Sequence, residues 1–208
     1  MVDQNKLKNY LQAIGSNGLP GLKAHIELTP YRKDVLPPKQ KIPKQGAVAV
    51  ILSFYSSSPS IILTRRASYA GVHGGQISFP GGKNDESDLD LHYTSIRETR
   101  EEIGIALDHS HYLGQLSQIY IPPSNFLVHP FLFFTNNKCI GIENNEVEYI
   151  LEFPVNELIK DSAITNKEIL LSDGRKIQNA PCFIYKDEII WGATAAILNE
   201  LRWLLKAI

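Results

Sequence analysis

The sequence predicts an α/β fold in which a mixed β-sheet lies between helices. The run AVAVILSFY is rich in β-branched and aromatic residues, as a central strand should be. Two helical patterns, one near each end of the chain, repeat apolar residues three or four positions apart. A third helix is predicted in the middle, after an apolar strand and a pair of glycines. Elements of this kind pack as helical layers on a sheet.

The N-terminal quarter of the chain should hold one short helix and little other regular structure. A helix is predicted over residues 5–14, because Leu7 and Leu11 share one face and Gly15 follows. Residues 20–43 are rich in proline and lysine and are expected to form an extended, irregular lead-in. His25 and Arg32 in this lead-in could contact a ligand, although exposed loop positions are the commoner role.

The remaining elements follow in chain order. An Asp-Gly pair between two apolar runs signals a hairpin, and the C-terminal run repeats apolar residues at helical spacing. The predicted elements are a strand at 47–55, its hairpin partner at 61–64, a strand at 113–121, a buried strand at 128–134, a short helix at 156–160, a hairpin within 168–185 around Asp173-Gly174, and a long helix with Ala193, Ile197, Leu201, Leu204 and Leu205 in its apolar stripe.

Composition excludes several classes of protein. The formal net charge is -1, which gives no electrostatic basis for binding nucleic acid or a membrane surface. The first residues carry charges and no apolar core of a secretory signal, and no run approaches the ~20 apolar residues of a membrane span. The two cysteines, Cys139 and Cys182, fit buried thiols in a reducing compartment. We therefore expect one cytoplasmic domain over 1–208, and leave open a homodimer.

The most informative stretch is 81–105, which reads GGKNDESDLDLHYTSIRETREEIGI. Positions three and four apart share a helix face, so Glu98, Glu101 and Glu102 should project together. Like charges at this spacing destabilise an isolated helix by about 0.2–0.5 kcal/mol per pair. A glutamate-rich face is often only solvated surface. The alternative is a hard divalent cation, because Mg²⁺ prefers oxygen ligands; as a ligand, Glu102 is expected to be exposed.

The residues around these glutamates favour the metal site. Asp88 or Asp90 can cap the helix, and Gly104 is a normal C-terminal stop. Gly81-Gly82 is predicted to form a turn directly after the apolar strand, where the backbone can approach a ligand closely. A strand, a glycine turn, an acidic loop and a carboxylate-bearing helix together define a site.

This stretch resembles the Nudix box, whose pattern is Gly, five residues, Glu, seven residues, Arg-Glu, an aliphatic residue, any residue, Glu-Glu, any residue, Gly and an aliphatic residue. The loop is one residue longer than the pattern, so the first acidic position, counted back from Arg97, falls on Leu89. Asp88 or Asp90 must stand in, and Thr99 replaces the aliphatic residue. The matching residues are Gly82, Arg97, Glu98, Glu101, Glu102, Gly104 and Ile105.

A narrower resemblance precedes the box. LTRRASYAGVHGGQISFPGG is similar to the signature of the coenzyme A diphosphatase branch of the Nudix family, and IIWGATA near the C-terminus is similar to the same branch. Ala67 stands where that signature has serine, and Gly71 where it has arginine. Losing that arginine predicts weak discrimination for the 3′-phosphate of coenzyme A. The residues that fit are Leu63, Thr64, Gly75, Phe79, Pro80, Gly81 and Gly82.

The resemblance implies a Nudix α/β/α sandwich with a mixed sheet and a hydrolase dependent on Mg²⁺ or Mn²⁺. It would cleave coenzyme A, or a derivative, to 3′,5′-ADP and 4′-phosphopantetheine. Two alternatives stay open. One is cleavage of ADP-ribose or another dinucleoside diphosphate, which Ala67 and Gly71 favour. The other is a nucleotide-binding module without catalysis, which the full glutamate set argues against.

The same resemblance implies roles for individual residues. The catalytic set is Arg97, Glu98, Glu101 and Glu102, with one of the glutamates as general base and Arg97 holding them in place. The metal ligands are Glu98, Glu101, Glu102 and the Gly82 carbonyl, and Glu146 is the candidate for a further acid outside the box. The substrate-binding candidates are Arg65, Arg66, His73 and Lys83, since guanidinium groups bind phosphate in a bidentate manner.

Overall fold

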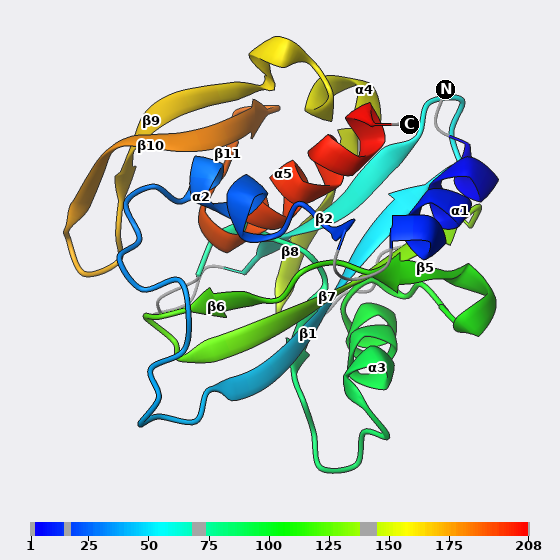
Figure 1. Ribbon diagram of the computed structural model, residues 1–208, viewed down its shortest axis with the longest axis horizontal. Helices are drawn as coiled ribbons and strands as arrows, with labels where there is room; N and C mark the ends of the chain where they lie inside the picture. The colour runs from blue at the N-terminus through cyan, green and yellow to red at the C-terminus, as the bar shows by residue number, and fades with distance from the viewer. Residues whose placement is uncertain (1–2, 15–17, 68–73, 138–144, 208) are drawn as a thin grey trace.

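A mixed sheet forms the centre of the fold (Figure 1). The structure is a computed structural model that describes residues 3–14, 18–67, 74–137 and 145–207. In these ranges eight strands form the sheet, along the path β3-β2-β1-β7-β5, with β4 on β1, β6 on β7 and β8 on β2. Strands β1 and β7 are parallel over their whole length, and every other pair is antiparallel. The strands are β1 (Lys44–Ser53), β2 (Ser60–Arg66), β3 (Ile77–Ser78), β4 (Gly81–Lys83), β5 (Tyr112–Gln115), β6 (Ile119–Ile121), β7 (Phe126–Thr135) and β8 (Val147–Pro154).

Strand β1 is central because both of its faces are buried. Ala47, Ala49 and Ile51 belong to one apolar cluster, whereas Val50 and Leu52 belong to another on the opposite face. This alternation follows the two-residue period of a strand. An uninterrupted apolar run is therefore what a strand covered on both faces requires.

Helices cover the two faces of the sheet (Figure 1). The first apolar cluster, with Ile103 of α3, lies between the sheet and that helix. The second contains Leu7 of α1, Leu28 of α2 and much of α5 on the other face. This is the predicted mixed α/β architecture with flanking helices. The helices are α1 (Gln4–Ile14), α2 (Leu22–Leu28), α3 (Leu91–Ile103), α4 (Val155–Leu158) and α5 (Gly192–Lys206), with 3₁₀ turns η2 (His109–His111) and η3 (Asp161–Ala163).

A three-stranded sheet is formed by β9 (Ile164–Leu170), β10 (Lys176–Tyr185) and β11 (Glu188–Ile190), in the order β11-β10-β9. The β9–β10 hairpin turns at the predicted Asp-Gly pair and extends to one side (Figure 1). Arg65 of β2 joins this sheet to the main one, because its Nη1 donates to Glu188 of β11 at 2.5 Å.

Two predicted segments have a different secondary structure from the one expected. The lead-in contains helix α2, whose residues Ala24, His25 and Leu28 are buried. Pro20 lies before the helix, where proline does not interrupt it. The strand expected over 113–121 is two strands, β5 and β6. They separate because the N–H of Ser117 donates to Glu200 of α5 instead of to a neighbouring strand.

His25 is a buried side chain and lies outside any loop, contrary to its expected exposure. Its Nε2 is 3.0 Å from Oε2 of Glu200, which is itself fully buried. The backbone N–H groups of Gly21 and Ser117 donate to the same carboxylate, each at 3.2 Å. Glu200 thus joins the start of α2, the β5–β6 connection and α5.

Other expectations are confirmed or fall outside the described residues. The helices near the two termini, the β1–β2 hairpin and the buried strand β7 are present. Cys182 is a buried free thiol, and Cys139 lies outside the described residues. Among the residues that the structure describes, no helix has the length and apolar character needed to cross a bilayer.

Candidate active site

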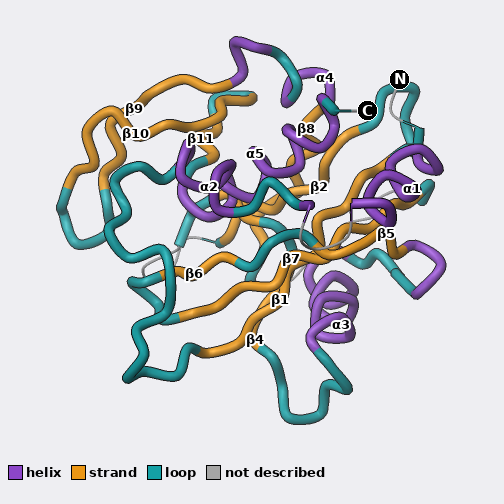
Figure 2. The backbone as a smooth tube through the Cα atoms, in the orientation of Figure 1, coloured by secondary structure: helices purple, strands orange, loops and turns teal. Residues whose placement is uncertain are grey.

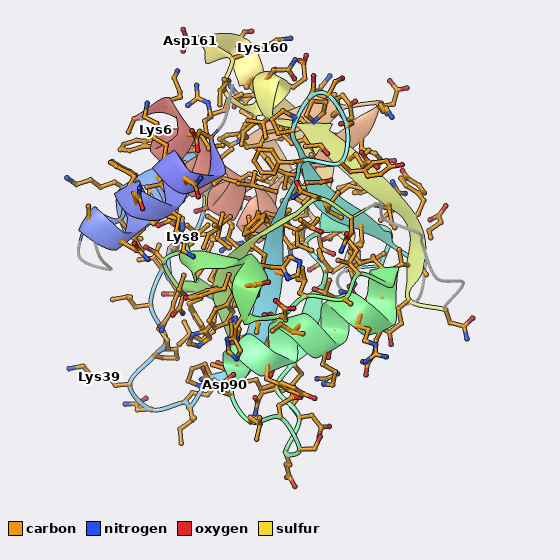
Figure 3. The ribbon with its side chains drawn as sticks, turned by 90° about the vertical axis from the view of Figure 1, so that its right-hand side faces the viewer. Lys6, Lys8, Lys39, Asp90, Lys160 and Asp161 are labelled. Carbon is orange, nitrogen blue, oxygen red and sulfur yellow. The ribbon has the colours of Figure 1, made fainter. Side chains whose placement is uncertain are left out.

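Helix α3 carries the glutamates, and its ends are set by local chemistry. The carboxylate of Asp90 accepts a hydrogen bond from the N–H of Tyr93 at 2.7 Å, so Asp90 is the N-cap. Figure 3 shows Asp90 at the start of the helix. Gly104 ends the helix with φ of 72°, a left-handed conformation that glycine adopts at low cost. The predicted helix and its stop are confirmed, and of the two candidate caps it is Asp90 that caps.

The glycine pair is part of strand β4, and the expected turn lies later, in the loop that leads to α3 (Figure 2). Gly82 pairs with Ala47 of β1. A Cβ on Gly81 would lie 2.3 Å from the Ala47 carbonyl oxygen, and one on Gly82 would lie 2.5 Å from the carboxyl of Glu98. Gly81 therefore requires glycine, and a side chain at Gly82 would displace the carboxyl of Glu98, which packs directly on the backbone there.

Glu102 is buried, contrary to expectation, with only 5% of its surface exposed. Its Oε2 accepts a hydrogen bond from the N–H of Gly81 at 3.2 Å. Burial raises the pKa of Glu102 to about 7, and the negative charges of Glu98 and Glu146 add to this shift. The positive charge of Arg66 and the Gly81 N–H oppose it. Glu102 thus titrates near neutral pH, where a bound cation would compete directly with the proton.

Glu98 shares this crowded environment. Burial raises the pKa of Glu98, and the charges of Glu101 and Glu146 act in the same direction, whereas Arg97 opposes them. Glu146 is distant in sequence, but the N–H of Ala67, at the end of β2, donates to its carbonyl at 2.8 Å. The structure therefore brings the predicted outside acid within electrostatic range of two box glutamates.

Arg97 is held on a carboxylate from the acidic loop. Its Nε and Nη2 donate to the two oxygens of Asp88 at 2.8 and 2.9 Å. Its Nη1 is 2.9 Å from both Glu98 and Glu101. These bonds hold the pKa of Asp88 well below its ordinary value and raise the pKa of Arg97. Asp88 therefore stands in for the acidic position that the pattern places on Leu89.

Glu101 differs from its two neighbours. Its side chain is 59% exposed and its carboxylate accepts from Arg97 across one helical turn. The predicted contact between Arg97 and Glu101 is confirmed. The metal-ligand role of Glu101 stays a prediction, since Glu98 and Glu102 are the two box carboxylates that burial sets beside the Gly81-Gly82 backbone.

The substrate-binding candidates separate in space. Arg66 lies close enough to Glu102 to lower its pKa, and its buried Nε has no hydrogen-bond partner in the described part of the chain. Arg65 is engaged by Glu188 and, at 3.8 Å, by Glu148. Lys83 is exposed on β4, where strand alternation directs it away from the Glu98 side of Gly82. His73 lies outside the described residues.

Asp88→Asn is expected to lower kcat by about tenfold to a hundredfold, because residues that orient metal ligands typically contribute that much. The amide cannot form the paired charge-assisted bonds that hold Arg97 beside Glu98 and Glu101. Steady-state rates at saturating substrate and Mg²⁺ measure the effect. Asp90→Asn is the matched control, since asparagine also caps helices. Loss of activity in the control alone would show that Asp90 holds the arginine.

The residues present fit a divalent cation that the substrate helps to bind. Within 3–14, 18–67, 74–137 and 145–207, no group of three His, Cys, Asp or Glu side chains forms a ready-made metal cage. Mg²⁺ rarely needs one, because it usually takes one or two carboxylates together with water and substrate phosphates. Burial raises the pKa values of Glu98 and Glu102, and the negative charge of Glu146 adds to both shifts. A bound cation would relieve the repulsion among these carboxylates.

The sheet, the box helix and this carboxylate arrangement define a class of hydrolase. A model of the NUDIX domain matches residues 43–172, more than half of the chain. The chain belongs to the Nudix hydrolase family, which acts on diphosphate bonds and generally uses divalent metal cations.

Two relatives resemble this chain over most of its length. Human mitochondrial coenzyme A diphosphatase NUDT8 is 32% identical over 169 residues, covering 78% of this chain and 70% of the relative. The uncharacterized Nudix hydrolase NudL of Yersinia enterocolitica is 34% identical over 146 residues, covering 69% of this chain and 72% of the relative.

Solved structures agree on the fold. A MutT/nudix family protein from Enterococcus faecalis has a TM-score of 0.55 at 18% identity, covering 99% of this chain and 76% of that chain. The Nudix hydrolase RenU from M. smegmatis has a TM-score of 0.54 at 12% identity, covering 85% of this chain and 97% of that chain. At these identities the likeness concerns the fold alone.

Sequence reasoning missed two features of the site. The N–H of Gly81 donates to Glu102, whereas the sequence pointed only to backbone carbonyls of this glycine pair as functional groups. The burial of Glu102 was also missed, because helical spacing alone placed it on the same face as Glu101. The sequence contained one signal, because the apolar residue Ile103 directly follows Glu102. In the structure Ile103 is fully buried, and this end of the helix lies against the sheet.

Proposed function

We propose that this Nudix hydrolase cleaves the diphosphate bond of coenzyme A or a derivative, giving 3′,5′-ADP and 4′-phosphopantetheine. The observation that carries the substrate is the 32% identity to human mitochondrial coenzyme A diphosphatase NUDT8 over 78% of this chain. The signature LTRRASYAGVHGGQISFPGG before the box supports the same branch.

In the proposed reaction the residues hold the cation, fix its ligands and bind the phosphate. Glu98 and Glu102 hold the cation, with Glu101 and the Gly82 carbonyl as further candidate ligands. Arg97, fixed by Asp88, keeps Glu98 in position. Arg66 offers a phosphate oxygen of the substrate its Nε, which has no hydrogen-bond partner among the described residues. Glu146 lies near enough to help orient a water or a second cation.

The cation we propose is Mg²⁺ or Mn²⁺, which when bound neutralises phosphate charge and lowers the pKa of a coordinated water. The chain itself must hold the diphosphate close to that water. The guanidinium of Arg66 suits this task because charge-assisted bonds to phosphate are strong and directional. Proton removal falls to one of the box glutamates.

A second candidate substrate is ADP-ribose or another dinucleoside diphosphate. The departures at Ala67 and Gly71 favour it, because the coenzyme A signature has serine and arginine there. Gly71 lies outside the described residues, and Ala67 bonds through its backbone to the Glu146 carbonyl. The chemistry at the diphosphate would be the same.

A hydrolysis panel separates these substrates. Coenzyme A, 3′-dephospho-coenzyme A, ADP-ribose and a dinucleoside diphosphate are each incubated with the protein and Mg²⁺, and the products are identified by mass. We expect the highest kcat/KM for coenzyme A, with 3′,5′-ADP and 4′-phosphopantetheine as products. A higher value for ADP-ribose would select the second candidate, and a nucleotide that shifts Tm without being cleaved would indicate a binding module.

Divalent cations are expected to raise Tm, and to raise it more at pH 8 than at pH 6. Because the folded pKa of Glu102 is about 7, the metal-free protein loses stability as pH rises through 7 and the carboxylate ionises. A cation that binds only the folded state restores it by mass action. Melting with millimolar Mg²⁺ is compared with melting in EDTA at both pH values. Equal melting temperatures in all four conditions would mean that the glutamates bind no cation.

A further inference from the structure

Arg32 joins two segments that the sequence singled out and the proposed site does not use. It lies in the lead-in between α2 and β1, and its Nη1 donates to the carbonyl of Tyr120 at 3.3 Å. Its Nη2 lies 3.7 Å from the position of a Cβ on Gly192, the first residue of α5. Gly192 belongs to the turn IIWGATA, so two distant segments of the chain meet at this guanidinium.

Among the residues that the structure describes, the charge of Arg32 has no anionic partner. No carboxylate forms an ion pair with it in the part of the chain that the structure describes, whereas Arg65 and Arg97 are each held by acids. Burial lowers the pKa of Arg32, which reflects the cost of desolvating an unpaired cation. Buried charges are normally paired or bound to a ligand. Since Arg32 remains partly exposed, an anion from solution can reach it.

One short segment runs from the first turn of α5, which begins beside Arg32, to the candidate active site. The hydroxyl of Thr194, in the first turn of α5, donates to the carbonyl of Ile77 at 3.1 Å. Four residues later, the N–H of Gly81 donates to Glu102. Four extended residues span at most about 14 Å. Thr194, two residues after Gly192, and the carboxylate of Glu102 therefore bond to the two ends of a segment no longer than that.

We propose that Arg32 binds a phosphate monoester of the substrate, separate from the diphosphate that is cleaved. For coenzyme A this group is the 3′-phosphate, and in that respect the proposal rests on the proposed function. Arg32 would supply the contact that Gly71 cannot make. Arg65 and Arg66 have other surroundings: Arg65 is held by Glu188, and Arg66 lies close enough to Glu102 to lower its pKa.

The test compares Arg32→Gln and Arg32→Lys with wild type. The wild type should prefer coenzyme A over 3′-dephospho-coenzyme A in kcat/KM by about tenfold to a hundredfold, the contribution of one charge-assisted hydrogen bond. Arg32→Gln should lose this preference through a higher KM for coenzyme A, with kcat and the values for the dephosphorylated substrate unchanged. Arg32→Lys should keep part of it. Arg175→Gln is the charge-matched control, because Arg175 is 76% exposed and pairs with Asp173 at the hairpin tip.

Two further measurements separate binding from a structural role. Arg32→Gln should melt at or above the wild-type temperature, because removing an unpaired, partly buried charge relieves its desolvation cost. Calorimetry should show weaker binding of 3′,5′-ADP, but not of 5′-AMP, in the variant. This binding test remains valid if coenzyme A is not cleaved. Such a result would reject the proposed function but not the role of Arg32.

Specific results would overturn the proposal. One is an unchanged preference for the 3′-phosphate in Arg32→Gln. Another is an equal loss of kcat/KM on both substrates together with a lower Tm, which would make Arg32 structural. Another is inorganic phosphate protecting wild type against melting, and not the variant, while both bind 3′,5′-ADP equally; Arg32 would then bind free phosphate only. If Arg32→Gln does not fold, the same comparisons with Arg32→Lys decide, and an unaltered lysine variant also overturns the proposal.

Discussion

Glu102→Gln is expected to lower kcat by two to three orders of magnitude without loss of the fold. The amide keeps the size of the side chain and can still accept the N–H of Gly81. It cannot supply the negative charge that a cation needs, and a bound cation contributes several kcal/mol to transition-state stabilisation. Each 1.36 kcal/mol corresponds to a factor of ten in rate, so losing most of one ligand accounts for the expected range.

The stability of the same variant checks the reasoning independently of activity. Because the pKa of Glu102 is about 7, wild type without metal carries a buried negative charge at pH 8 but largely not at pH 5. Glu102→Gln should therefore melt above wild type at pH 8 in EDTA and close to it at pH 5. Glu168→Gln, on the exposed face of β9, is the control for a lost surface carboxylate. Wild-type turnover at saturating Mg²⁺ would contradict the assignment of Glu102.

Glu200→Ala should destabilise the fold by about 3 kcal/mol or more, since each buried donor left without an acceptor costs about 1–3 kcal/mol. The fully buried carboxylate accepts from His25 and from the backbone N–H groups of Gly21 and Ser117. Alanine leaves these donors without an acceptor, and unsatisfied buried donors are costly. The change should appear as a lower denaturant midpoint with an unchanged slope.

Two companion variants sharpen this measurement. Glu200→Gln keeps one acceptor oxygen, so it should fall between wild type and Glu200→Ala. Glu168→Ala removes an exposed carboxylate that pairs with Lys176, and such surface pairs contribute only about 0–1 kcal/mol. Equal midpoints for Glu200→Ala and Glu168→Ala would show that the buried cluster around Glu200 does not stabilise the fold.

The elements that the sequence predicted well are those fixed by neighbouring residues. Helix α3 begins at the cap of Asp90 and ends at Gly104 because each acts within about one turn of itself. Strand β1 was predicted because its run of apolar residues suits burial on both faces. Helix α2 was missed because neighbouring residues there do not indicate a helix: the surrounding prolines dominate the local pattern. The burial of Ala24 and Leu28 comes from packing near α5.

The partners of individual side chains were decided by the tertiary structure. Helical spacing groups Glu98, Glu101 and Glu102, but only packing against β4 buries Glu102 and leaves Glu101 exposed. Arg65 and Arg66 are adjacent and have the same chemistry, but they have different partners. The partner of Arg65 is Glu188 of β11, more than a hundred residues later in the chain.

The amino-acid sequence by itself determined the class of chemistry, because metal-binding carboxylates, caps and close-packed glycines must occur at fixed short spacings along one strand and one helix. The tertiary structure alone decided how those groups are charged and what surrounds them. Burial, the approach of Glu146 and the meeting of Arg32 with Gly192 depend on contacts between residues far apart in the chain. Such contacts form only when the sheet and its helices pack, so no local pattern contains them.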